Sequence, residues 1–224
     1  MQMNMETDAP DLASVIGTLE QELMLPPGFI AALYREDDWS FVIKSHALVE
    51  ALLTYLLTAH LGNPSAGSIF AFLDTSNPRT GKLAFAKAFG ILDEDARRFV
   101  RGLSELRNEL VHNVSNVSFT FATHTAQLNK QSRRAWIQAF GYGLFVIGEA
   151  RLGALDAQAK QQLGEIVFHA PKLSIMASVA WLALLIYSRG QNADIRLAVD
   201  RLADILNNEY EQKQLALMKA QQAQ

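Results

Sequence analysis

The segment from residue 39 to residue 61, WSFVIKSHALVEALLTYLLTAHL, is the feature that most limits how this chain can fold. It is apolar on most sides of a helical projection, and a helix without a polar face is stable only when other elements surround it. Asp37 or Asp38 can cap its start, because both precede the first apolar residue. We therefore expect a long central helix that other helices cover on several sides.

Apolar residues recur at helical spacing along most of the remaining chain, which indicates an all-α fold. We expect helices over 11–24, 93–112, 125–150, 156–169, 173–187 and 192–220, and short helical turns over 28–35 and 68–74. Residues 114–121 alternate as a strand does, but a lone strand would lack a partner, so a loop is favoured. The natural division is an N-terminal helical segment (1–37), a helical core (38–150) and a C-terminal helical extension (151–224).

Composition excludes several kinds of function. The chain has no cysteine, which rules out disulfides, thiolate zinc sites and cysteine nucleophiles. Its net charge of -3 supplies no overall basic field for nucleic acid, so any contact with RNA must be local. The pair Gly81-Lys82 lacks the upstream glycine of a phosphate-binding loop, which argues against nucleotide hydrolysis. We expect no metal and no cofactor, and the polar N-terminus, which is unlike a secretory signal, favours a cytoplasmic location.

Residues 173–187, LSIMASVAWLALLIY, form a run of fifteen residues without a charge. A helix needs roughly 20 apolar residues to span a bilayer. The run therefore predicts a helix buried in the core or in a dimer interface, and insertion into a membrane is the less favoured alternative.

The stretch 104–113, SELRNELVHN, brings Arg107, Asn108 and His112 together inside an apolar helical pattern. Asn108 and His112 are four residues apart and share a face, and the long side chain of Arg107 can reach toward them. A guanidinium binds phosphate oxygens, an imidazole transfers protons near neutral pH, and an amide can orient the imidazole or a substrate oxygen. The three residues are the candidate catalytic site, with a phosphate as ligand.

A structural interpretation of the same residues stays open. Arg107 can pair with a glutamate, and His112 can cap the C-terminus of the helix, where a cationic side chain complements the helix dipole. His46 and Glu50, four residues apart on the central helix, likewise either support the site as an oriented base or form a satisfied pair in the core, and the second is favoured.

The densest basic cluster precedes the candidate site and consists of Arg97, Arg98 and Arg101. It is either a track for the RNA backbone that leads toward His112 or a solvated face paired with nearby carboxylates. Trp136, beside two arginines, can stack a nucleic-acid base, but a tryptophan that opens an apolar stripe is more often a core residue.

The hexapeptide from Arg107 to His112, RNELVH, resembles the R-x4-6-H motif of the HEPN superfamily, in which a polar residue commonly follows the arginine. Residues 82–92, KLAFAKAFGIL, followed by an acidic helix start, are similar to the segment before this motif in HEPN relatives of the mannitol operon repressor type. The helix over 39–61 looks like the companion helix of the same core, with Glu50 where such helices often carry an acid. The resemblance covers roughly residues 38–150.

The resemblance implies a HEPN-like bundle of four or five helices that forms a homodimer through the motif helix, so that both copies of Arg107 and His112 line one cleft. It implies metal-independent RNA cleavage of a toxin or defence type. In this reaction the ribose 2′-hydroxyl attacks the adjacent phosphate, His112 transfers protons, Arg107 stabilises charge and Asn108 orients. An antitoxin or other regulatory protein would then be a partner.

Two rival classes remain. The chain is acidic, and its C-terminal third has no counterpart in the minimal domain. As the alternative, the similarity to mannitol-repressor-type proteins suggests a non-catalytic transcriptional regulator or protein-interaction module, in which the motif holds the dimer together. A membrane-associated helical protein would depend on residues 173–187 alone, and a membrane partner is not expected.

Overall fold

The computed structural model describes residues 17, 18, 20, 21 and 23–191, and all regular structure within them is helical. This confirms the predicted all-α fold. The helix predicted over 192–220 lies outside the described residues, as does most of the one predicted over 11–24.

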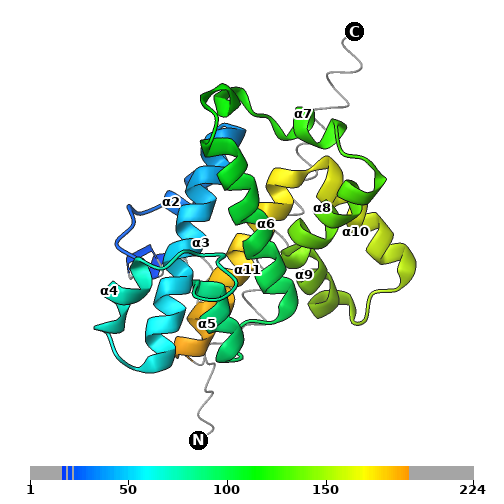
Figure 1. Ribbon diagram of the computed structural model, residues 1–224. Helices are drawn as coiled ribbons and strands as arrows, with labels where there is room; N and C mark the ends of the chain where they lie inside the picture. Colours follow the sequence, from blue (N-terminus) through cyan, green and yellow to red (C-terminus); the bar gives the residue numbers. More distant parts are fainter. Residues whose placement is uncertain (1–16, 19, 22, 192–224) are drawn as a thin grey trace, which may run out of the picture.

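The long apolar segment forms α3 (Asp38–Leu61), which lies at the centre of the bundle (Figure 1). Asp37 caps it as expected, because its side chain accepts a hydrogen bond from the backbone N–H of Ser40 at 2.9 Å. The helix ends at Gly62, whose φ of 61° is left-handed and suits glycine. Helices α6 (Glu94–Val111) and α11 (Pro171–Gln191) pack against α3 and provide the surroundings that its apolar surface requires.

The remaining helices cover this three-helix centre on two sides. Three short helices lie on the side of α3: α2 (Phe29–Leu33), α4 (Ala66–Ala71) and α5 (Lys82–Ala88). Three longer ones lie on the other side: α8 (Lys130–Phe140), α9 (Tyr142–Leu152) and α10 (Ala157–His169). Since α8 packs on α6, α9 on α11 and α10 on both α8 and α11, the elements after residue 150 share one core with those before it.

The uncharged run over 173–187 is buried in that core. Ile175, Val179 and Leu182 in α11 are each fully inaccessible to solvent. By length and composition alone, α3 is able to cross a membrane, and so is α10 taken together with α11 as far as Tyr187, although these two helices meet at a bend of 109°. In the folded chain, 56% of the apolar 18-residue stretch of α3 that passes this test is buried inside the molecule.

The prediction of one helix over 125–150 is wrong. The chain forms α8 and α9, which are separated by a bend at Gly141. A Cβ atom at this position would lie 2.6 Å from the carbonyl oxygen of Ile137 and 2.4 Å from the ring of Phe145, so the bend needs glycine. The apolar periodicity continues across the bend, and for that reason it gave no sign of two helices.

Residues 114–121 form no strand. A 3-10 helix, η1 (Val114–Ser118), follows α6, and α7 (Phe121–Ala126) begins directly afterwards. The absence of a strand here was expected, but most of the expected loop is a 3-10 helix and its last residue begins α7. Asp38 at the start of α3 fixes this connection, because its carboxylate accepts a hydrogen bond from the backbone N–H of Phe121 at 2.9 Å.

Candidate functional site

The candidate site lies at the C-terminal end of α6. Asp93 caps the start of this helix by accepting a hydrogen bond from the N–H of Ala96 at 2.7 Å, and Glu94 and Asp95 occupy its first turn, where acids suit the helix dipole. The helix ends at Val111, and the backbone N–H of His112 donates to the carbonyl oxygen of Asn108 at 3.2 Å. His112 therefore occupies the C-cap position through its backbone N–H, and its side chain is exposed.

Arg107 and Asn108 are joined directly. Arg107 Nη1 donates a hydrogen bond to Asn108 Oδ1 at 3.0 Å, and both side chains are half-buried. Arg107 makes no ion pair with a described residue, so the expected alternative of an arginine–glutamate pair is not observed there. Arg107 and His112 lie about 140° apart around the helix. The bond to Asn108 draws the guanidinium toward the face that His112 shares.

His46 is tied to α6 rather than to Glu50. Its Nε2 lies 3.2 Å from Ser104 Oγ, and the Ser104 hydroxyl donates its only proton to the carbonyl oxygen of Val100 at 2.9 Å. Nε2 must then carry the proton that it donates to Ser104. Burial lowers the pKa of His46; the charge of Glu50 opposes this and that of Arg107 adds to it. His46 is thus a neutral, buried residue of α3 that contacts α6 one turn before Arg107.

Glu50 pairs with a lysine from another helix. Its Oε1 lies 2.8 Å from Lys82 Nζ and accepts a hydrogen bond from Thr75 Oγ1 at 3.1 Å. Burial raises the pKa of Glu50, but the hydrogen bond and charge of Lys82 outweigh burial, so the pKa lies below its ordinary value. Lys82 is 1% exposed, so its buried ammonium group and the Glu50 carboxylate hold α5 against α3.

Burial of two histidines gives a testable pH dependence. The pKa values of His46 and His124 are lowered, in both cases mainly by burial. As pH falls, the unfolded chain therefore takes up protons on these histidines before the folded chain does. The free energy of unfolding should keep its full value above about pH 6.5 and decline as pH falls below that value. Denaturant titrations at a series of pH values measure this decline.

The matched variants are His46→Gln and His124→Gln. Each should flatten part of the decline between about pH 6.5 and 5, above the range in which carboxylates titrate. An unchanged slope in both variants would mean that neither histidine is the source.

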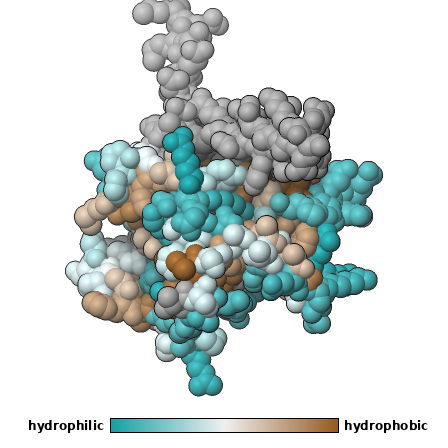
Figure 2. Space-filling model, turned by 90° about the horizontal axis from the view of Figure 1, so that it is seen from above, coloured by the Kyte–Doolittle hydropathy of each residue, from teal (hydrophilic) through white to brown (hydrophobic). Residues whose placement is uncertain are grey.

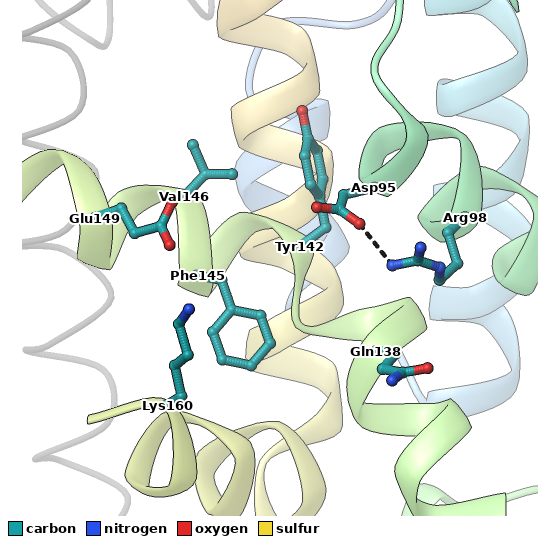
Figure 3. A pocket seen from close by; sticks show the side chains of 8 residues that line it. All are labelled: Asp95, Arg98, Gln138, Tyr142, Phe145, Val146, Glu149 and Lys160. Carbon is teal, nitrogen blue, oxygen red and sulfur yellow. Dashed lines mark hydrogen bonds and ion pairs between the residues drawn. The ribbon is translucent and has the colours of Figure 1, made fainter. Parts of the chain in front are cut away.

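Two of the three clustered arginines are engaged with acids of their own helix. Arg97 lies 2.6 Å from Glu94 and also donates to the carbonyl oxygen of Leu92, and Arg98 lies 2.6 Å from Asp95. Both ion pairs join residues that are three positions apart in α6. Figure 3 shows the Asp95–Arg98 pair on one side of a cavity of about 260 Å³, with Glu149 and Lys160 on the other. Arg101 is exposed and forms no ion pair with a described residue.

Trp136 is a core residue. It is 6% exposed, and its ring lies against Phe140 with 4.3 Å between centroids. The stacking of a base on an exposed indole face is therefore not available, although one edge of Trp136 reaches a groove beside α6.

Ser104, Thr75 and Lys82 are the residues around the site that sequence reasoning assigned no role. Ser104 stands 58 positions from His46, and Lys82 stands 32 positions from Glu50. No spacing rule connects positions so far apart in the sequence. Among the described residues no cluster of three or more His, Cys, Asp or Glu could hold a metal ion.

Comparisons of the chain with protein-family models, with curated proteins and with solved structures find no match.

Proposed function

We propose that this protein is a metal-independent RNA endonuclease whose reactive groups are Arg107, Asn108 and His112. The observation that carries the proposal is the arrangement at the end of α6. An exposed imidazole stands one helical turn after an amide that holds a guanidinium in place, and most donors of that guanidinium are unused within the described residues. Such a group can donate hydrogen bonds to the oxygens of a phosphodiester.

The three groups suit a transesterification within the RNA strand. The ribose 2′-oxygen forms a bond to the adjacent phosphorus as the bond from phosphorus to the 5′-oxygen breaks. His112 accepts the proton of the 2′-hydroxyl or returns one to the leaving 5′-oxygen, and Arg107 neutralises the charge that develops on the non-bridging oxygens. Asn108 fixes the guanidinium. The products are a 2′,3′-cyclic phosphate and a 5′-hydroxyl, and no metal takes part.

A second copy of the chain would complete this site. Val111 at the end of α6 and Val117 in η1 are 38% and 63% exposed, so both offer apolar surface near the motif. The end of the molecule seen from above in Figure 2 shows apolar patches among hydrophilic side chains. A homodimer through this end would bring two copies of the motif together and offset the angle that separates Arg107 from His112 in one copy.

The same two valines favour a second candidate function, a non-catalytic regulator or interaction module. In that case the apolar surface serves to hold a second copy or a regulatory protein, and Arg107 and Asn108 only stiffen the interface. Both functions require the dimer, so the dimer alone does not separate them.

Cleavage of a mixed RNA pool in EDTA tests the proposal. Full-length protein should leave fragments with cyclic-phosphate ends, and sedimentation should give twice the mass of one chain, 24.8 kDa. A dimer that leaves the RNA pool intact would reject the endonuclease and favour the regulator. Cleavage that stops in EDTA would reject the metal-independent reaction.

A further inference from the structure

A groove of about 430 Å³ runs between α6 and α8, on the opposite side of α6 from His46. The two helices come closest at Gly102, where a Cβ atom would lie 3.0 Å from the Cβ of Ala139. Small and apolar residues of both helices form the floor, namely Gly102, Leu106, Ala135, Ala139 and Phe140. The floor of the groove is therefore apolar.

The charges on the α6 wall change sign along the groove. Arg101 lies toward one end, and Glu105 and Glu109 follow one and two turns later on the same face. The rise of the helix places Glu105 about 6 Å and Glu109 about 12 Å from Arg101 along the axis. All three side chains are exposed and form no ion pair with a described residue. A complementary ligand carries negative charge at one end and N–H donors at the other.

Aromatic rings close the acidic end. The imidazole of His124 lies half-buried against the indole of Trp136, with 5.1 Å between ring centroids, and both residues line the groove. Glu109 and His124 both line this part of the groove, so the carboxylate and the imidazole face the same ligand. A planar ligand that enters here meets an aromatic surface with a carboxylate at its edge.

We propose that this α6–α8 groove binds one guanosine phosphate unit of a single-stranded RNA, with the phosphate at Arg101 and the Watson–Crick edge of the base at Glu105 and Glu109. Guanine presents two adjacent N–H donors, at N1 and N2, which match the two oxygens of a carboxylate. Uracil presents one donor between two carbonyl oxygens, which a carboxylate repels. The apolar floor and His124 receive the sugar and the face of the base.

The inference rests on the proposed function, since it names the substrate element that the endonuclease would select. His112 lies about 60° around the helix from Glu109 and about 40° from Asn108, between the groove and the Arg107–Asn108 pair. The acidic end of the groove therefore lies beside His112, so a strand that leaves the groove at this end would continue past the candidate site.

Fluorescence anisotropy with short labelled oligouridines tests the inference, with and without one central guanosine. The protein carries His112→Ala, so that cleavage does not consume the probe. The guanosine probe should bind about ten-fold more tightly than oligouridine, and Glu105→Gln or Glu109→Gln should remove most of that preference. Glu149→Gln, a change of the same charge at an exposed position outside the groove, should not.

The phosphate contact has a separate signature. Arg101→Gln should weaken both probes equally and reduce the slope of log affinity against log salt by about 0.7, the value for one contact to a single strand. Arg79→Gln, which removes the same charge from the exposed loop before α5, is the control.

Equal binding of both probes, or a guanosine preference that survives both glutamate substitutions, would overturn the inference. Competition by free guanosine monophosphate as strong as that by the unlabelled oligonucleotide would assign the groove to a free nucleotide and overturn its assignment to RNA. Guanosine-selective binding without any cleavage by the unsubstituted protein would reject the endonuclease but leave the groove assignment standing. RNA cleavage that does not change when Arg101, Glu105 or Glu109 is substituted would support the endonuclease and overturn the groove assignment.

Discussion

Replacing His112 by alanine is expected to slow RNA cleavage by about 10²–10⁴-fold, the contribution of a positioned proton-transfer group. The loss should fall on the rate and not on folding, because the imidazole is exposed and only its backbone N–H takes part in the end of α6. Arg107→Ala should cost about 10²–10³-fold, since it removes a donor that meets charge in the transition state. Both are measured as single-turnover cleavage rates in EDTA.

Two matched variants show whether the effect is local. His169→Ala removes another exposed imidazole, at the end of α10, and should cleave as the unsubstituted protein does. Arg107→Lys keeps the charge but loses the planar fork and the pairing with Asn108, so it should recover only part of the rate. If His112→Ala and His169→Ala cleave equally well, His112 has no part in the reaction and the site must be sought elsewhere.

Gly143→Ala is expected to destabilise the fold by about 3 kcal/mol, at the upper end of the usual cost of overpacking. Gly143 lies in the first turn of α9, where a Cβ atom would stand 2.4 Å from the backbone nitrogen of Ser178 and 2.5 Å from the carbonyl oxygen of Ala177 in α11. The backbones of α9 and α11 would have to separate. The separation would also break the hydrogen bond from the N–H of Gly143 to Ser178 Oγ, 2.9 Å long.

Thermal and denaturant unfolding measure this loss, which corresponds to a fall in Tm on the order of 10 °C for a chain of this size. Gly164→Ala in α10 is the control. Its Cβ would make ordinary contacts of 3.5 and 3.7 Å with Ile137, and alanine favours a helix over glycine, so this variant should gain about 0.5–1 kcal/mol. Similar stabilities for the two variants would show that α9 and α11 do not approach as closely as the structure has them.

The sequence by itself determined the long helices α3, α6, α10 and α11 and most of their ends, whereas α5 and α7 could not be predicted from it. Caps and periodicity are local signals: Asp37, Asp93 and Asp156 each accept a hydrogen bond from an N–H three residues later, and a reader of the sequence can find such residues by position alone. The same local pattern singled out Arg107, Asn108 and His112, and it failed at Gly141, because the apolar stripe continues across a bend at which a Cβ atom would clash with Ile137 and Phe145.

Only the tertiary structure decided which side chains meet across helices. His46 contacts Ser104, Glu50 pairs with Lys82, and the α6–α8 groove brings His124 to Glu109, all through the way the helices pack. A helix repeats every 3.6 residues, so the sequence tells which residues share one helical face. It does not tell which face of another helix lies opposite. That choice depends on the combined shape of the whole core, and it is why the candidate reactive residues could be named from the chain while their surroundings could not.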